Sequence, residues 1–217
     1  RDPASMLGKI TRSGGNLMAK SELFTSIEVD GWGSNLEQYQ TGLAYDLRQV
    51  ASILRHDLAN EGNPGNQSGL SFFHAAIGGF DTHSEQGANN ADAWHPSLMR
   101  WVSEAMTGFQ RDLEALGIAN RVVTLTYSEF GRRIEQNDSG NTAGTDHGTA
   151  NGMLVMGDPA LLNSGIYGQM PNLADPDEHG NMQITTDFRE VYAAVIQWLG
   201  GDVNAVIGPF TALPLFK

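Results

Sequence analysis

Residues 121–127 read Arg-Val-Val-Thr-Leu-Thr-Tyr, and this stretch decides the fold class that the sequence predicts. Its β-branched and aromatic side chains favour a buried strand. The apolar side chains between 96 and 116 come just before it and recur every three or four residues, which predicts an amphipathic helix that Gly117 ends. A helix that leads directly into a strand is the repeating step of an α/β fold.

Further elements on both sides of this stretch continue the alternation. Short apolar runs over 70–77 and 153–157 predict two more buried strands. Helices are expected from Leu36 to about Asn60 and from Thr186 or Asp187 to Leu199. Strands that alternate with helices favour a mostly parallel sheet flanked by helices, in which ligands bind beyond the C-terminal ends of the strands.

The chain divides into two parts by composition. Residues 1–35 are rich in Gly and Ser and are expected to form an irregular lead-in, and residues 36–217 are expected to form a single α/β domain. The sequence begins at Arg1 without a Met. We therefore interpret it as a processed or truncated product, which is compatible with a lost export signal.

Composition excludes several classes of function. The 217 residues carry a formal net charge of −12, which argues against nucleic acid as a partner. There is no Cys, so thiol catalysis and Cys-ligated metals are excluded. No apolar run reaches the roughly 18 to 20 residues that span a bilayer, so we expect no membrane span.

Reactive side chains gather in three Gly-flanked segments, which cover residues 79–86, 128–133 and 144–149. In the first, Asp81 and His83 stand two residues apart on an expected loop, where both side chains can reach one cation. An oxygen and an imidazole nitrogen suit Zn²⁺, Mn²⁺ or Fe²⁺, and Glu85 is a further candidate ligand or acceptor. The alternative is that Asp81 caps a following helix and His83 lies on the surface.

The third segment places Asp146 and His147 side by side before Gly148. Neighbours in an extended segment point in opposite directions, so one would bind a metal ion while the other orients a ligand or a substrate. The flanking glycines permit unusual backbone angles and close approach. The alternative is an Asx-turn before a strand, with His147 exposed at its edge.

The second segment contains Ser128, Glu129, Arg132 and Arg133. Glu129 is a candidate metal ligand or base, and Ser128 is a candidate nucleophile. Either arginine could hold a phosphate or sulfate group through two hydrogen bonds. The alternative is a buried Glu–Arg pair that fixes the loop.

The other histidines carry weaker signals. His74 lies within an apolar run and is expected to be a core residue, whereas His56 is expected on a helix surface. His95 precedes the helix that begins near Pro96, and His179 is expected in an exposed turn.

These segments, together with Thr186-Asp187-Phe188-Arg189, resemble in order the bacterial domain-of-unknown-function family 1501. The resemblance covers about Leu36 to Phe210. That family is similar to a distant branch of the alkaline phosphatase and sulfatase superfamily, which implies the C-terminal part of an alkaline phosphatase-like fold. It also implies an exported protein, located in the periplasm or outside the cell.

The resemblance further implies a two-metal site. Asp81 and His83 match the ligands of a first metal ion, to which His147 returns. Ser128-Glu129 takes the place of an Asp-His pair at the second metal ion, although an alternative alignment gives that place to Asp146-His147. The superfamily's nucleophile and one of its metal-binding Asp residues come from an N-terminal half that this chain does not resemble.

Two functions are therefore expected. The first is a metal-dependent hydrolase of phosphate or sulfate esters, in which Asp81, His83 and His147 hold one divalent cation. Glu129 and Asp146 would either assist at this ion or hold a second one. Arg132 would stabilise charge on the transferred group, and a second chain would supply the missing half. The alternative is a non-catalytic binding or assembly module on a degenerate hydrolase scaffold, with one Ca²⁺ or no metal ion.

Overall fold

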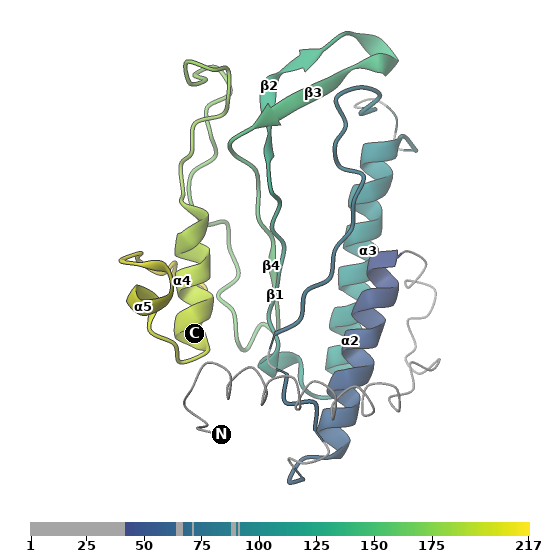
Figure 1. Cartoon of the computed structure of the whole chain (residues 1–217), viewed down its shortest axis with the longest axis vertical. Coiled ribbons are helices and arrows are strands. Elements are labelled where there is room, and N and C mark those ends of the chain that lie inside the picture. Colours follow the sequence, from purple (N-terminus) through teal and green to yellow (C-terminus); the bar gives the residue numbers. More distant parts are fainter. Residues whose placement is uncertain (1–41, 64–66, 71, 88–89, 91) are drawn as a thin grey trace, which may run out of the picture. The chain divides into compact units, whose positions relative to one another are not determined.

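The computed structural model describes residues 42–63, 67–70, 72–87, 90 and 92–217 (Figure 1). The predicted lead-in over 1–35 and the predicted helix start at Leu36 lie outside these residues. The described chain falls into two compact units. One contains the residues up to Ile77 together with Trp101–Leu116, and the other contains Gly78–Arg100 and Gly117–Lys217. A single domain over 36–217 stays a prediction.

The first unit contains two of the predicted helices. Helix α2 covers Gly42–Ala59 and buries its apolar face, including Leu43 and Leu47. Helix α3 covers Trp94–Ala115 and contributes its residues from Trp101 onward to this unit, where Phe109 and Leu113 are buried. The three- and four-residue spacing therefore identified both helices, and Gly117 follows the second with a φ of 71°, as expected of a helix stop.

The strand predicted over 70–77 is wrong for the residues that the structure describes there. These residues belong to no strand, and those over 72–77 alternate between exposed and half-buried. His74 is exposed and is not a core residue. An apolar run alone does not make a strand, because its backbone N–H and C=O groups also need a ladder partner.

The second unit contains two small sheets, both antiparallel. Strand β1 (Thr124–Leu125) pairs with β4 (Val155–Met156), and β2 (Gly131–Asn137) pairs with β3 (Gly144–Gly148). The fold is mixed α/β, as predicted. The described residues contain no parallel strand pair, so the predicted mostly parallel sheet is not found in them.

The strand predicted over 121–127 is shorter than expected. A 3₁₀ turn takes up Ala119–Arg121, and only Thr124 and Leu125 belong to β1. At Thr126 the side-chain hydroxyl, not the backbone carbonyl, accepts the Leu154 N–H at 2.9 Å. The ladder ends here because a β-branched hydroxyl side chain takes the place of the backbone acceptor.

The hairpin β2–β3 was not predicted. The 3₁₀ turn η4 (Gly140–Thr142) lies between its strands. The register pairs Gly131 with Gly148 and Arg132 with His147, and it shifts between Arg132 and Gln136. Polar residues dominate β2, so its sequence has no apolar alternation from which a strand could be recognised.

The C-terminal part of the second unit has an apolar core. Helix α4 (Phe188–Trp198) begins at the predicted cap Asp187, whose carboxylate accepts the Arg189 N–H. Val191 and Ala194 of α4 pack with Leu215 from the tail. The short helix α5 (Val203–Ile207) follows in the tail and is capped by Asp202.

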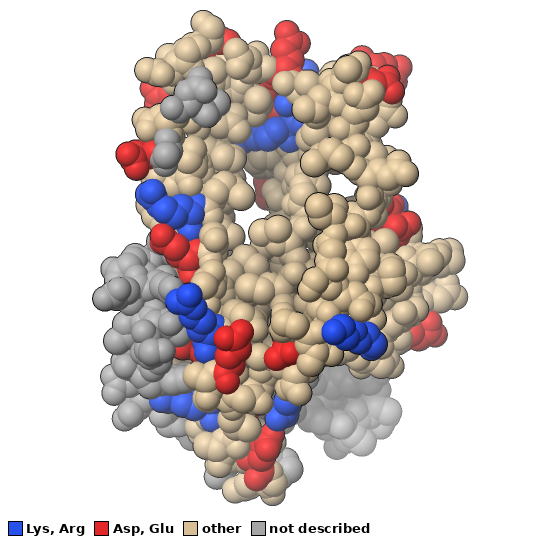
Figure 2. Space-filling view, turned by 180° about the vertical axis from the view of Figure 1, so that it is seen from behind, with Lys and Arg blue, Asp and Glu red and all other residues tan. Residues whose placement is uncertain are grey.

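The surface carries its charges in a dispersed pattern. On the face drawn in Figure 2, Lys and Arg side chains lie singly or in small groups between acidic residues. Within the described ranges no helix is both long and apolar enough to cross a bilayer.

Candidate metal centre

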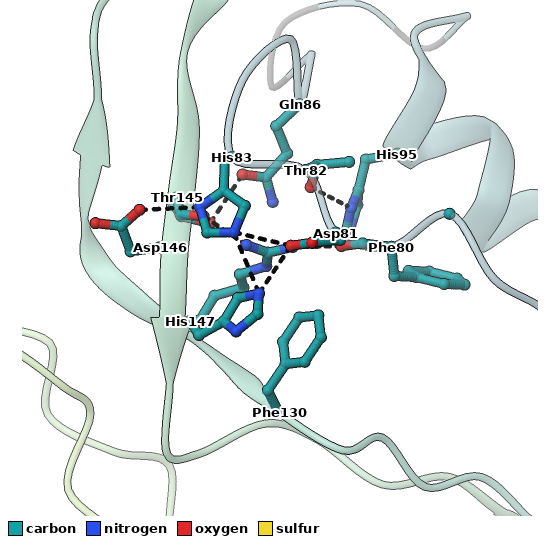
Figure 3. Close-up of polar contacts among 12 residues, drawn as sticks. Phe80, Asp81, Thr82, His83, Gln86, His95, Phe130, Thr145, Asp146 and His147 are labelled. Carbon is teal, nitrogen blue, oxygen red and sulfur yellow. Dashed lines mark hydrogen bonds and ion pairs between the residues drawn. The ribbon is translucent and has the colours of Figure 1, made fainter.

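The candidate centre is built where the segment after Gly79 lies against the hairpin β2–β3, all within the second unit (Figure 3). The Thr145 N–H of β3 donates to the Thr82 carbonyl at 3.3 Å. At the other end of the segment, the Gln86 N–H donates to the Ala143 carbonyl at 2.9 Å, and the Thr145 hydroxyl donates to the Gln86 side chain at 3.0 Å. The segment is therefore fixed to the hairpin on both sides of His83.

Glycines permit this close packing. A Cβ atom on Gly144 would lie 2.2 Å from the backbone carbon of His83, and one on Gly148 would lie 2.5 Å from the Arg132 carbonyl. Contacts below 3.0 Å are closer than real side chains approach, so both positions require Gly. The glycines flanking Asp146-His147 thus serve close approach, as predicted, rather than left-handed backbone angles.

Three side chains direct ligand atoms toward one point. Asp81 Oδ1 lies 2.7 Å from His147 Nε2 and 2.9 Å from His83 Nε2, and the two imidazole nitrogens are 3.2 Å apart (Figure 3). Among the described residues these three form a group that could hold a metal ion, with all ligand atoms within 4.8 Å of one another. Two ligands bound to one ion at about 2.1 Å are roughly 3 Å apart at coordination angles near 90 to 110°. The separations therefore fit a single ion.

The group is open to solvent. The exposed fraction of the side chain is 61% for Asp81 and 47% for each histidine. A centre with three protein ligands and an open side is typical of catalytic metal sites, whereas structural sites are closed by four protein ligands.

His83 and His147 are held by different contacts. Nδ1 of His83 lies 3.0 Å from Asp146 Oδ1. The ring of His147 stacks on Phe130, with centroids 3.8 Å apart and planes 11° apart. The neighbours Asp146 and His147 thus have separate partners, and Asp146 contacts the nitrogen of His83 that faces away from the group.

Arg132 connects the Asp81 segment to the hairpin. Its guanidinium donates to the backbone carbonyls of Phe80 and Thr145, and Nη2 lies 3.6 Å from the Asp81 carboxylate. Only 16% of the side chain is exposed. These contacts of Arg132 differ from the alternative considered above, a buried Glu–Arg pair. Arg132 instead positions the segment that carries Asp81.

The surrounding charges favour ionised carboxylates. The His147 hydrogen bond is the main cause of the lowered pKa of Asp81, and the nearby His83 and Arg132 lower it further. The hydrogen bond from Asn137, followed by that from His83, lowers the pKa of Asp146. Both side chains are therefore available as anions over a wide pH range.

Other candidate residues lie outside the group. Glu129 is exposed and does not converge with the three ligand atoms. The Ser128 hydroxyl donates to the Phe130 carbonyl at 2.8 Å. Arg133 is exposed on β2, and its backbone forms an isolated antiparallel β-bridge with Asn181. Roles for these residues, and for Arg132 toward a substrate, stay predictions.

Three residues near the centre were not identified from the sequence as parts of a site. Asn137 lies at the end of β2 and donates to Asp146 at 2.8 Å. His95, on the first turn of α3, contacts the Thr82 hydroxyl at 3.2 Å, and burial lowers its pKa. Phe130 was part of a quoted segment but had no assigned role. The partners of these three residues are not their neighbours in the sequence, so no local sequence pattern indicates their contacts with the centre.

Near the end of β3, a surface hollow of about 410 Å³ begins two residues beyond His147. Its lining combines polar and apolar side chains, namely Thr149, Asp177, Met182, Gln183 and Ile184. The Thr149 hydroxyl donates to the Met182 carbonyl at 3.2 Å, which fixes this wall to the hairpin strand.

Comparison with known proteins gives one relationship. No curated protein and no solved structure matches the chain significantly. A family model described as "Protein of unknown function (DUF1501)" matches residues 65–215, which include all three ligands and the hairpin. The chain therefore belongs to the DUF1501 family of proteins of unknown function.

Proposed function

We propose that Asp81, His83 and His147 hold one divalent transition-metal ion and that the chain is a metal-dependent hydrolase. The observation that supports this most is convergence. Ligand atoms from Asp81 and His147, which are 66 residues apart, approach to 2.7 Å on a segment and a hairpin that hydrogen bonds fix together.

The donor set limits the identity of the ion. Two imidazole nitrogens and one carboxylate oxygen suit zinc, manganese or iron. Calcium prefers oxygen ligands in greater number, so the Ca²⁺ alternative fits these residues poorly. When bound at an open site, such an ion lowers the pKa of a water ligand or polarises an ester oxygen.

The residues around the ion would position its ligands and leave one side of the ion free for a substrate. Arg132 holds the backbone on both sides of the centre, and its positive charge lies 3.6 Å from Asp81. A phosphate or sulfate ester as the substrate rests on the resemblance to the alkaline phosphatase and sulfatase superfamily, as do export from the cytoplasm and a second chain.

The test is hydrolysis of 4-nitrophenyl phosphate and 4-nitrophenyl sulfate. Metal-free protein is reconstituted separately with zinc, manganese and iron, and His83→Ala and His147→Ala are compared with His179→Ala. His179 lies in an exposed turn beside Glu178, outside the centre, and is the matched control.

We expect turnover that requires one of these ions and that falls at least about 100-fold in the two ligand variants, with the control unchanged. Equal turnover by metal-free protein would contradict the proposal. Bound metal without turnover of either ester would support the alternative, a binding or assembly module. Exposed apolar side chains at Ile166 and Met170, 99% and 90% accessible, would suit such a module.

A further inference from the structure

The imidazole of His83 has a different partner at each ring nitrogen. Nε2 lies 2.9 Å from Asp81 Oδ1, inside the ligand group, while Nδ1 lies 3.0 Å from Asp146 Oδ1 (Figure 3). A neutral imidazole carries one proton, so the nitrogen that donates to a carboxylate leaves the other with a free lone pair. Asp146 at Nδ1 favours the form of His83 that can bind a cation through Nε2, whereas Asp81 at Nε2 favours the other form as long as no cation is bound.

Asn137 fixes the position of this carboxylate. Its side-chain amide donates to Asp146 Oδ1 at 2.8 Å and to the His83 carbonyl at 3.3 Å. One amide thus contacts both the acceptor carboxylate and the backbone of the histidine. Asn137 itself pairs with Gly144 at the end of the hairpin ladder, where any Cβ would collide with the His83 backbone.

We propose that Asp146, held by Asn137, is a positioning residue that orients His83 and keeps its proton on Nδ1, and that it does not bind the metal ion directly. This inference rests on the proposed metal centre and assigns Asp146 a role different from the ligand role that the sequence predicted. The two histidines would then be oriented by different contacts, because the ring of His147 stacks on Phe130.

The first experiment measures metal binding. Affinity for zinc is determined by chelator competition, and ions per chain at saturation by elemental mass spectrometry, for the parent, Asp146→Asn and Asp146→Ala. Glu135→Ala is the control, since Glu135 is an exposed carboxylate on the same hairpin.

Loss of an outer carboxylate partner typically reduces metal affinity about 10- to 100-fold. We expect this reduction for Asp146→Ala with the number of ions per chain unchanged. The metal affinity of Asp146→Asn should fall less, because its amide oxygen can still accept the hydrogen bond from Nδ1–H of His83. Loss of one ion per chain in Asp146→Ala would show direct ligation and overturn the inference, as would unchanged affinity.

The second experiment needs no metal ion. Long-range ¹H–¹⁵N NMR at a pH where His83 is neutral identifies the protonated nitrogen of its ring in the metal-free protein. Asp81→Ala is present in the parent and in every variant compared, because it removes the competing carboxylate at Nε2. The Nδ1–H form should predominate in the parent and in Asp146→Asn, and Nε2–H should become populated in Asp146→Ala. The same form in all three proteins would contradict the inference. This result is independent of whether the chain binds metal, so a failure of the proposed centre is distinguishable from a failure of the positioning role.

Discussion

The hairpin region with the Asp81 segment and the C-terminal region around α4 belong to the same unit but are stabilised in opposite ways. At the hairpin, ligand side chains are exposed and the segments are connected by hydrogen bonds from Arg132, Thr145 and Gln86. Around α4, buried Val191, Ala194 and Leu215 pack together. Polar contacts fix directions, which a metal centre needs, whereas apolar burial supplies stability with little directional preference.

This contrast gives an experimental criterion. Substitutions of the residues that connect the hairpin to the Asp81 segment should change metal binding and stability together. Substitutions around α4 should lower stability and leave the metal affinity of the folded protein unchanged.

The largest effect is expected for Arg132→Ala. Removing a largely buried guanidinium leaves the carbonyls of Phe80 and Thr145 without their charged donor, and such hydrogen bonds contribute about 1.5 to 3 kcal/mol each. We expect a loss of about 4 kcal/mol in the free energy of unfolding and a large loss of metal affinity, measured by denaturant titration and chelator competition. Arg133→Ala, at an exposed neighbour, should change stability by less than about 0.5 kcal/mol. Similar losses of stability and metal affinity in Arg132→Ala and Arg133→Ala would contradict the positioning role of Arg132.

Gly144→Ala tests the close approach at the centre. Its new Cβ would meet the His83 backbone at 2.2 Å, so the Asp81 segment must move, at a cost of about 3 kcal/mol. Gly140→Ala is the matched control, because no atom lies within 4 Å of its Cβ position, although its φ of 65° disfavours Ala by about 1 kcal/mol. The unfolding temperature and the zinc affinity should both be lower for Gly144→Ala than for Gly140→Ala. Unchanged zinc affinity would show that the segment is not fixed by this contact.

Leu215→Ala tests the other side of the comparison. Leu215 is only 4% exposed and contacts the α4 core, so its truncation should destabilise the protein by about 2 to 3 kcal/mol. Zinc affinity measured well below the unfolding transition should match the parent. A loss of affinity in the folded variant would show that the two regions are coupled.

Asp187→Ala should give the smallest effect. The carboxylate caps α4 and its pKa is lowered to about 2, chiefly by the Arg189 hydrogen bond. Loss of such a cap costs about 1 kcal/mol. Because the pKa in the folded state lies below the ordinary value of 3.8, this contribution is present above pH 4 and is lost as the pH falls toward 2.

Urea titrations of parent and Asp187→Ala at pH 7 and near pH 2.5 measure this difference. The difference in the free energy of unfolding between parent and Asp187→Ala should be smaller at the lower pH. A gap that stays constant would show that the cap does not depend on ionisation.

Local signals in the sequence predicted the C-terminal region well. The predicted cap at Asp187 and the predicted helix end at Leu199 depend on one continuous segment, and α4 forms there. The same kind of signal identified α2 and α3. The apolar run over 70–77 gave a wrong strand because strand formation depends on a partner that the run itself does not specify.

The centre could be predicted only in part. Residue type and Gly flanks singled out Asp81, His83 and His147, and the structure brings their ligand atoms together. The hairpin that positions them was missed because β2 is polar and its pairing depends on Arg132 and on glycine contacts distant in sequence. The position of Asp146 at Nδ1 of His83 likewise follows from tertiary contacts that spacing does not show.

The central claim is that three residues from two segments form one metal site. The most direct measurement is the metal content of natively purified protein, and of protein reconstituted with zinc, manganese and iron, by elemental mass spectrometry. Asp81→Ala and His147→Ala are compared with the parent and with His179→Ala. The account predicts about one ion per chain in the parent and the control and none in the two ligand variants. Absence of bound metal in the parent after reconstitution, or full retention in both ligand variants, would contradict it.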